Sequence, residues 1–129
     1  MTSMISHIDH IVLTTTDLER CVAFYRDVLG MTLEPFGEGR LALKFGNQKI
    51  NIHQRGREFE PKAHIPAPGA LDLCFIASIP LDDVIVRLKA AGIPILQGPV
   101  PKTGATGPIR SVYVRDPDLN LIEISEPVR

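Results

Sequence analysis

The chain repeats itself, and this internal repeat constrains its fold more than any other feature. The segment DHIVLTTTDLERCVAFYRDVLGMTL in the first half resembles LDLCFIASIPLDDVIVRLKAAGIPI in the second half. With His10 aligned on Asp72, each half reaches a glycine twenty residues later, at Gly30 and Gly92. Two copies of one pattern predict two structural units built on the same plan.

Hydrophobic periodicity gives each half the order strand, helix and then three strands. Thr16 and Glu19 form a capping-box pattern that predicts the start of the first helix, and Gly30 predicts its end. Pro80 suits the first turn of the second helix, which Gly92 would end. The segment between the halves is rich in charged residues, proline and glycine, as a connector would be.

We therefore expect an α+β fold in which two paired βαβββ units form a cup-shaped sheet. Each unit alone is too small to bury a good core, so the two units should pack together. The expected single domain covers residues 5–129. Its first unit spans about 5–56, its linker about 57–69 and its second unit about 70–126.

Four of the expected strands carry polar groups on the face opposite their main apolar row. Alternation along the strands places His10, Asp72 and Glu123 on such faces. On the expected fourth strand, Asn51 and His53 share that face, and the repeat leaves open which of them corresponds to Glu123. Burying several such groups without partners would cost of the order of a few kcal/mol each, so partners are required. A divalent cation is one such partner for histidine and carboxylates.

Each of these residues also has a purely structural interpretation. His10 alone could be a hydrogen-bonded histidine, and Asp72 could cap a turn or pair with a basic side chain. Glu123 could pair with Arg110 or Arg115. The metal interpretation is favoured for the set, because His10 and Asp72 hold equivalent repeat positions and Glu123 lies on the strand that closes the second unit.

These features resemble the vicinal oxygen chelate superfamily, which includes glyoxalase I, fosfomycin-resistance proteins, methylmalonyl-CoA epimerase, extradiol dioxygenases and bleomycin-resistance proteins. The resemblance runs from HIDHIVLTTTDLERCVAFYRDVLGM to RDPDLNLIEIS and so covers nearly the whole chain. Four further segments are similar to a group that contains glyoxalase-domain-containing protein five and bacterial proteins labelled virulence proteins. They are FGNQKINIH, FEPKA, PGALDLCFI and GPVPKTGATGPIRSVYVRDPD.

The resemblance implies a metal-dependent lyase or isomerase of the glyoxalase type that acts on a small oxygen-chelating substrate. It implies that His10, Asp72 and Glu123 bind the metal. His53 would be the fourth group, with Asn51 as its substitute. Glu123 would also be the catalytic residue that moves a proton. Asp72 stands where the family more often has histidine, which favours Mn²⁺ or Mg²⁺ and leaves Ni²⁺, Zn²⁺ and Fe²⁺ open.

Two other functions fit the same resemblance. An extradiol-type dioxygenase would use Fe²⁺ held by two histidines and one carboxylate, which would require His53 as a ligand. A ligand-binding protein of the bleomycin-resistance kind would work without a metal, and the presence of the ligand set argues against it. Small members of the superfamily commonly form homodimers, so the four groups could come from one chain or from two. No residue indicates whether glutathione takes part.

The composition argues against other classes of partner. The net charge of −1 and the pI of about 6.4 give no reason to expect binding to nucleic acid or to an anionic membrane. No apolar run approaches the ~18 residues that a membrane helix needs, and the first residues lack a signal-peptide pattern. Cys21 and Cys74 lie in apolar stretches and are expected to be buried free thiols, as in a cytoplasmic protein.

One turn departs from the family pattern. Leu119 in the segment DPDLN stands where the family commonly has glycine. If the turn needs a positive φ at this position, either the leucine backbone is strained or the turn differs from that of the family.

Overall fold

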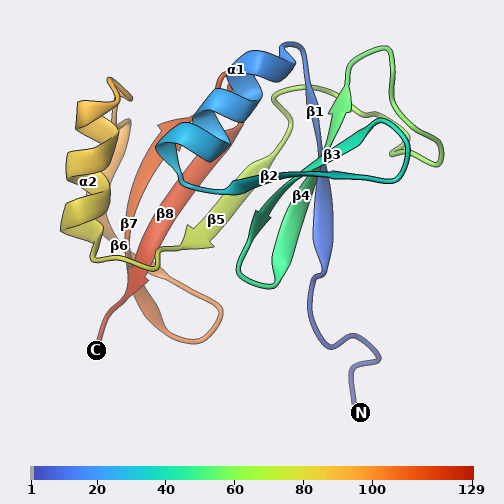
Figure 1. Cartoon of the computed structure of the whole chain (residues 1–129). Coiled ribbons are helices and arrows are strands. Elements are labelled where there is room, and N and C mark those ends of the chain that lie inside the picture. The colour runs from blue at the N-terminus through green and yellow to red at the C-terminus, as the bar shows by residue number, and fades with distance from the viewer. Residues whose placement is uncertain (1) are drawn as a thin grey trace. The chain divides into compact units, whose positions relative to one another are not determined.

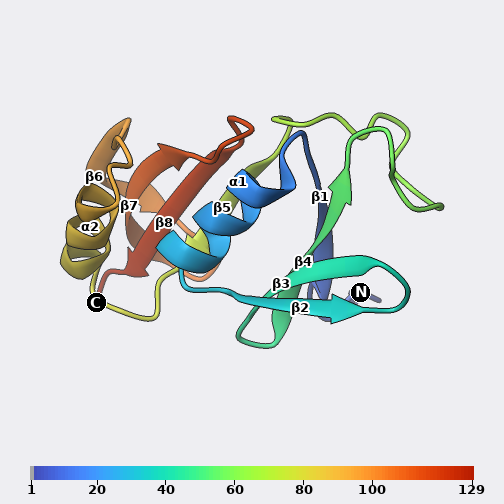
Figure 2. The same cartoon turned by 45° about the horizontal axis from the view of Figure 1, so that its top comes forward.

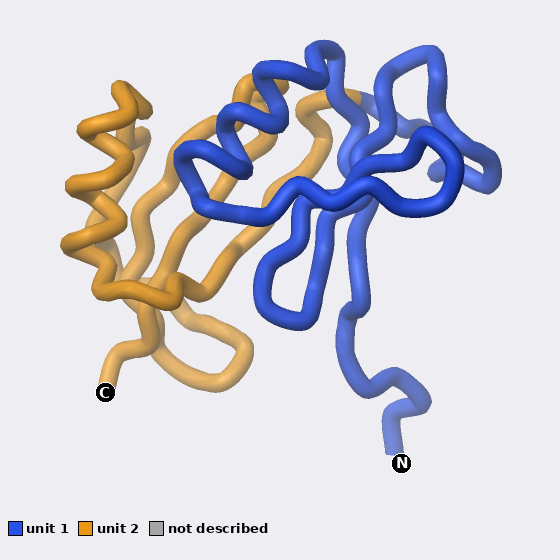
Figure 3. The backbone as a smooth tube through the Cα atoms, viewed as in Figure 1, with its two compact units in different colours: residues 1–67 blue, residues 68–129 orange. Residues whose placement is uncertain are grey.

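The computed structural model describes residues 2–129. The chain divides into two compact units, one ending at Ala67 and the other beginning at Pro68 (Figure 3). Each unit contains a four-stranded mixed sheet and a helical segment (Figures 1 and 2). The boundary between the units falls inside the segment expected to be a linker. The fold class is α+β, as the repeat predicts.

The first unit contains one sheet with the strand order β1-β4-β3-β2. Strand β1 runs parallel to β4, and the other neighbours are antiparallel. The elements are β1 (His10–Thr15), α1 (Leu18–Val22), the π-helical segment η1 (Ala23–Val28), β2 (Thr32–Phe36), β3 (Arg40–Phe45) and β4 (Gln48–Gln54).

The second unit repeats this plan with the strand order β5-β8-β7-β6. Strand β5 runs parallel to β8, and the remaining neighbours are antiparallel. The elements are β5 (Asp72–Ile76), α2 (Leu81–Ala90), β6 (Gln97–Thr103), β7 (Pro108–Arg115) and β8 (Leu121–Pro127). The order strand, helix, three strands is therefore confirmed in both units.

Each sheet has one strongly apolar face. In the first unit this face carries buried residues from β1, β3 and β4: Leu13, Leu43, Ile50 and Ile52. In the second unit it carries buried residues from β7 and β8: Val112, Val114, Ile122 and Ile124. Helix α2 contacts β7 and β8 and buries Leu81, Val84 and Leu88. The polar side chains of interest lie on the opposite face of each sheet.

The helices begin at residues slightly different from those predicted. Asp17, and not Thr16, is the N-cap of α1, and its carboxylate accepts a hydrogen bond from the Arg20 N–H at 3.2 Å. Pro80 is the N-cap of α2 and offers no side-chain acceptor. Glu126 on β8 provides the missing acceptor, because its Oε2 accepts a hydrogen bond from the Leu81 N–H at 3.0 Å. A tertiary contact thus does the work of a local cap.

A buried hydrogen-bonded turn joins the starts of β5 and β8. The Asp116 carboxylate accepts from the N–H groups of Asp118 and Asn120 at 2.9 Å each and from the Asn120 amide at 2.8 Å. The Asn120 Oδ1 accepts from the Leu71 N–H at 2.9 Å. Leu119 has a φ of 71°, so the expected strain is present. This turn fixes where β8 begins and therefore where Glu123 lies.

One expectation about the thiols is wrong. Cys21 is buried, but Cys74 is exposed, and neither is in a disulfide. Cys74 lies opposite Glu123 in the register of β5 and β8, on the polar face of the second sheet. No helix within residues 2–129 has the length and apolarity needed to span a membrane.

Candidate functional site

The register brings two of the candidate residues together in each unit. His10 and Asn51 lie on the parallel strands β1 and β4, two residues out of register and on the same face. Asp72 and Glu123 stand in the same relation on β5 and β8. Diagonal neighbours of this kind have Cα atoms about 7–8 Å apart. Asn51 therefore takes the position in the first unit that Glu123 takes in the second.

His53 lies farther along β4. Its register partner is Thr14, four residues beyond His10, a spacing of about 13 Å along a strand. The His53 side chain is 2% exposed, and its Nε2 lies 3.5 Å from the Arg40 guanidinium. This spacing favours Asn51 over His53 as the group that acts together with His10.

His10 is oriented by the residue before it. Its Nδ1 lies 2.8 Å from the Asp9 Oδ1, and this hydrogen bond, opposed by desolvation, lowers the pKa of Asp9. The side chain of His10 is 43% exposed. A histidine that is held through one ring nitrogen presents the other to a metal or a substrate, which is a common arrangement at metal sites. The Nε2 of His10 is thus available.

Glu123 is held by hydroxyl groups rather than by arginine. The buried Ser111 hydroxyl donates to its Oε2 at 2.6 Å, and the buried Ser125 hydroxyl donates to the same oxygen at 3.4 Å. Burial raises the pKa of Tyr113, and the charge of Glu123 and a hydrogen bond to it raise the pKa further. The phenol O–H therefore stays protonated and donates a hydrogen bond to the carboxylate.

The arginines that could have paired with Glu123 have other partners. Arg110 donates to Glu126 at 3.0 Å and to Asp82 at 3.1 Å. Arg115 donates to the carbonyl oxygen of Leu119 at 3.3 Å. The structural interpretation of Glu123 as an arginine partner is therefore wrong. Within residues 2–129, no salt bridge joins Glu123 to a basic side chain.

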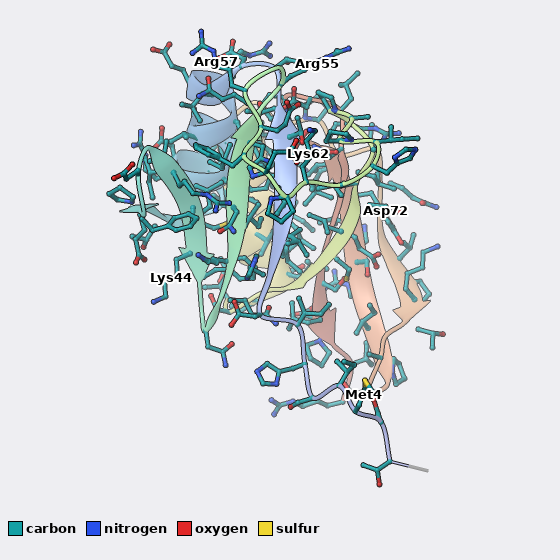
Figure 4. The ribbon with its side chains drawn as sticks, turned by 90° about the vertical axis from the view of Figure 1, so that its right-hand side faces the viewer. Met4, Lys44, Arg55, Arg57, Lys62 and Asp72 are labelled. Carbon is teal, nitrogen blue, oxygen red and sulfur yellow. The ribbon has the colours of Figure 1, made fainter. Side chains whose placement is uncertain are left out.

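Asp72 opens strand β5, where its side chain is exposed (Figure 4). In the part of the chain that the structure describes, its carboxylate makes no hydrogen bond or ion pair. The neighbouring Cys74 Sγ lies 3.4 Å from the Ser125 Oγ. Partial desolvation, above all, raises the pKa of the Cys74 thiol, although the residue as a whole is exposed.

The donor set can be tested against a divalent metal ion. Within residues 2–129, no three His, Cys, Asp or Glu side chains form a group that could hold such an ion. Each unit instead offers one pair, and the Oδ1 of the buried Asn51 has no hydrogen-bond partner among the described residues. An imidazole nitrogen, carboxylate oxygens and an amide oxygen are each donor types that suit Mg²⁺, Mn²⁺ or a borderline ion. The chemistry of the donors fits.

A cavity in the first unit lies away from these pairs. It has a volume of about 220 Å³ and contains none of the candidate residues. Its lining residues are Leu18, Gly39, Leu41, Ile52, Gln54, Arg57 and Phe59. Leu41 and Ile52 are register partners, and Ile52 belongs to the apolar face of the first sheet. The cavity therefore does not contribute to the candidate site.

Comparison with known protein families shows to which family this chain belongs. Residues 7–124 match the family described as the Glyoxalase/Bleomycin resistance protein/Dioxygenase superfamily. The chain belongs to this superfamily. Its members generally use divalent metal ions, bind small molecules and often form dimers. The predicted resemblance to the vicinal oxygen chelate proteins is thus confirmed.

Two relatives are similar over most of this chain. Virulence protein STM3117 of Salmonella typhimurium is 55% identical over 125 residues, which cover 97% of this chain and 87% of the relative. Its crystal structure has a TM-score of 0.95 and aligns with 98% of this chain and all of that chain. Glyoxalase domain-containing protein RDO1 of Mycosarcoma maydis is 53% identical over 118 residues, 92% of this chain and 66% of the relative.

More distant relatives have names that state an activity. The ethylmalonyl-CoA/methylmalonyl-CoA epimerase of Cereibacter sphaeroides is 29% identical over 95% of this chain and 99% of its own length. The lactoylglutathione lyase of Agrobacterium tumefaciens is also 29% identical, and its crystal structure has a TM-score of 0.73. The alignment covers 95% of this chain and 94% of that chain. The antibiotic-binding protein TnmS3 from Streptomyces shares the fold. It is 22% identical to this chain and has a TM-score of 0.76, and the alignment covers 98% of this chain and all of that chain.

Proposed function

We propose that this protein is a metal-dependent enzyme of the glyoxalase type, a lyase or isomerase that acts on a small oxygen-chelating substrate. The observation that supports this most is the pair of carboxylates on β5 and β8, Asp72 and Glu123, matched by His10 and Asn51 at the equivalent positions of the first unit. The two pairs, taken from one chain or from two copies, supply four groups to one ion.

Each of these residues would bind the ion through a different kind of atom. His10 binds through Nε2, because Asp9 occupies its Nδ1. Asp72 brings an unpaired carboxylate, and Asn51 brings a buried amide oxygen without a protein partner. When bound, the ion acts as a Lewis acid that stabilises negative charge on a substrate oxygen. His53 remains the alternative to Asn51, although the register supports Asn51.

Glu123 is the proposed base. Its carboxylate accepts a proton from the substrate carbon next to the chelating oxygen and returns it to a neighbouring atom. Ser111 and Tyr113 are positioning residues, because their hydroxyl groups hold the carboxylate in one orientation. Tyr113 keeps its own proton and so does not compete for the substrate proton.

The relatives support a proton-transfer reaction over the alternatives. An ethylmalonyl-CoA/methylmalonyl-CoA epimerase and a lactoylglutathione lyase are each 29% identical to this chain, and an epimerase moves a proton at a carbon atom. An extradiol-type dioxygenase would need His53 to act with His10, and the spacing of about 13 Å along the strands opposes this. A metal-free binding protein is the second candidate, since no group of three ligands lies together in the described residues.

The reaction can be tested by proton exchange. The Mn²⁺-loaded chain would be incubated in deuterium oxide with hemithioacetals of 2-oxoaldehydes and with 2-methyl-branched acyl thioesters. We expect deuterium incorporation or turnover of one class, reduced about 10²-fold or more in Glu123→Gln. Glu126→Gln is the matched control on the same strand, because Glu126 caps α2 and lies on the other face. Equal rates in wild type and Glu123→Gln would reject Glu123 as the base.

We further propose that the protein is a homodimer of the cytoplasm. The tendency of the superfamily to form dimers supports the first part, and two free thiols in the described residues suit a reducing compartment. Sedimentation equilibrium of the purified chain would test the dimer.

A further inference from the structure

Positive charge gathers on the polar face of the first sheet. Arg40 and Lys44 lie on β3 and Lys49 on β4, all on the same face. Lys44 and Lys49 are direct register partners, an arrangement in which like charges destabilise the sheet. Among the described residues, none of the three cations is in a salt bridge. Figure 4 shows Lys44 beside this sheet.

Aromatic rings hold two of these cations. The Arg40 guanidinium carbon lies 4.9 Å from the centre of the Phe36 ring and 5.0 Å from that of Phe59. The Lys49 ammonium lies 3.8 Å from the centre of the same Phe36 ring. Rings attract a cation but do not replace the oxygen acceptors that a guanidinium fork and an ammonium group bind. The Lys49 ammonium and the Arg40 N–H groups that do not face His53 therefore remain available for an anion.

His53 adds a further unused donor. Arginine can only donate, so the contact between Arg40 and the His53 Nε2 makes that nitrogen the acceptor and leaves the proton on Nδ1. The side chain is 2% exposed, and its Nδ1 has no hydrogen-bond partner among the described residues. Burial and then Arg40 lower the pKa of His53, which keeps the ring neutral. Donors exceed acceptors around Arg40.

The nearby carboxylates do not neutralise this cluster. Glu34 lies on the same face of β2, opposite Ala42, yet it forms no ion pair within the described residues. Glu58 acts on His53 electrostatically, but its Oε2 accepts from the Gly56 N–H at 3.1 Å. Asp9 is affected by the charge of Lys49 but is hydrogen-bonded to His10. The excess of positive charge is thus intrinsic to this face.

We propose that Arg40 and Lys49 form a subsite for the carboxylate of a small organic acid, whose carbon atoms contact Phe36 and Phe59. A planar carboxylate matches the guanidinium fork in a two-point hydrogen bond. The two phenylalanines supply apolar surface that an inorganic anion would not use. The inference goes beyond the proposed function and does not require a metal ion. If both hold, the substrate carries an acid group.

A titration of the full chain without added metal tests the subsite. The probes are benzoate, its neutral match benzamide, acetate and inorganic phosphate, in about 0.15 M NaCl to screen weak surface binding. The readouts are the NMR resonances of the Arg40 Nε–H and the His53 ring. We expect a saturable shift with benzoate, a weaker one with acetate and none with benzamide.

Matched variants locate the site. Arg40→Gln should weaken benzoate binding about tenfold or more, because a charge-assisted hydrogen-bond pair is lost. Arg20→Gln makes the same charge change at an exposed residue of α1 in the same unit, and it should change affinity less than about twofold. Lys49→Gln provides the second test if Arg40→Gln does not fold. Glu123→Gln should bind benzoate as the wild type does, which separates this subsite from the metal proposal.

Four results would overturn the subsite. The first is no saturable shift at about 10 mM benzoate, where a site of millimolar Kd would be mostly filled. The second is benzamide binding as tightly as benzoate. The third is an equal loss in Arg40→Gln and Arg20→Gln, which would indicate diffuse charge. The fourth is binding of phosphate alone, which would reject a carboxylate ligand.

Discussion

At the scale of single residues, Leu119 has a backbone conformation that few side chains adopt. Its φ is 71°, and its side chain is 66% exposed, so it gains little from packing. Leu119→Gly should raise the free energy of unfolding by roughly 0.5–1 kcal/mol, because relief of the left-handed strain exceeds the added freedom of the unfolded chain. Urea denaturation measures this.

The control for this prediction is Leu119→Ala. Alanine removes the exposed side chain but keeps the Cβ atom that clashes with the backbone. We expect no stabilisation from it. If the alanine and glycine variants were equally stabilised, strain at Leu119 would not be the cause.

His53 makes stability depend on pH. Burial and Arg40 lower its pKa below the ordinary value of 6.5, with Glu58 opposing them. The unfolded chain therefore takes up this proton at a higher pH than the folded chain does. The contribution of His53 is complete above pH 6.5 and is lost as the pH falls through the lowered folded pKa.

We therefore expect the free energy of unfolding of the metal-free chain to fall more steeply as the pH drops below 6.5 in the wild type than in His53→Gln. The difference in slope should be a fraction of one proton. His64→Gln, at an exposed histidine of the connecting segment, should keep the wild-type slope. Parallel curves for wild type and His53→Gln would show that His53 is not the titrating group.

At the scale of elements, the turn before β8 depends on Asn120. This residue is 1% exposed and joins the Asp116 carboxylate to the Leu71 N–H. Asn120→Ala should lower the free energy of unfolding by about 2–3 kcal/mol, because a buried N–H and a buried carboxylate oxygen lose their partners. Thermal and chemical denaturation would measure it.

Asn47→Ala is the matched control. Asn47 lies in the exposed turn between β3 and β4, and its loss should cost less than about 0.5 kcal/mol. If both asparagine variants were equally stable, the buried turn would not hold β8 to β5.

Local sequence patterns predicted much of each strand and helix. Alternation alone placed His10, Asp72 and Glu123 on the polar faces, because the two-residue period of a strand is a local property. Gly30 and Gly92 have φ values of 83° and 73° and end the helical segments as expected.

Long-range pairing was harder to predict. The choice between Asn51 and His53 depends on how β4 pairs with β1, which no short segment determines. The positioning role of Tyr113 likewise arises because β7 sets it opposite Glu123. The same parity argument along residues 108–115 could have placed Ser111 and Tyr113 on the face of Glu123. Only the register shows that they lie beside it.

At the scale of the whole molecule, two similar units divide the candidate ligands equally. The first unit offers His10 and Asn51, and the second offers Asp72 and Glu123. Neither pair alone supplies the four to six ligands that a divalent ion usually takes. Metal binding should therefore be lost when either unit loses one of its groups.

The most direct test is the metal content of the purified chain by elemental analysis. The chain would be stripped, reloaded separately with Mn²⁺, Ni²⁺, Zn²⁺ and Fe²⁺, and compared with His10→Ala and Glu123→Gln. His64→Ala and Glu126→Gln are the matched controls, since neither residue belongs to the two pairs.

We expect about one ion per chain in the wild type and in both controls, and a loss of the ion in His10→Ala and in Glu123→Gln alike. Asn51→Leu should also lose it, while His53→Gln should keep it. A chain that binds no ion tightly, or that keeps its ion in both His10→Ala and Glu123→Gln, would contradict the metal site and favour a metal-free binding protein.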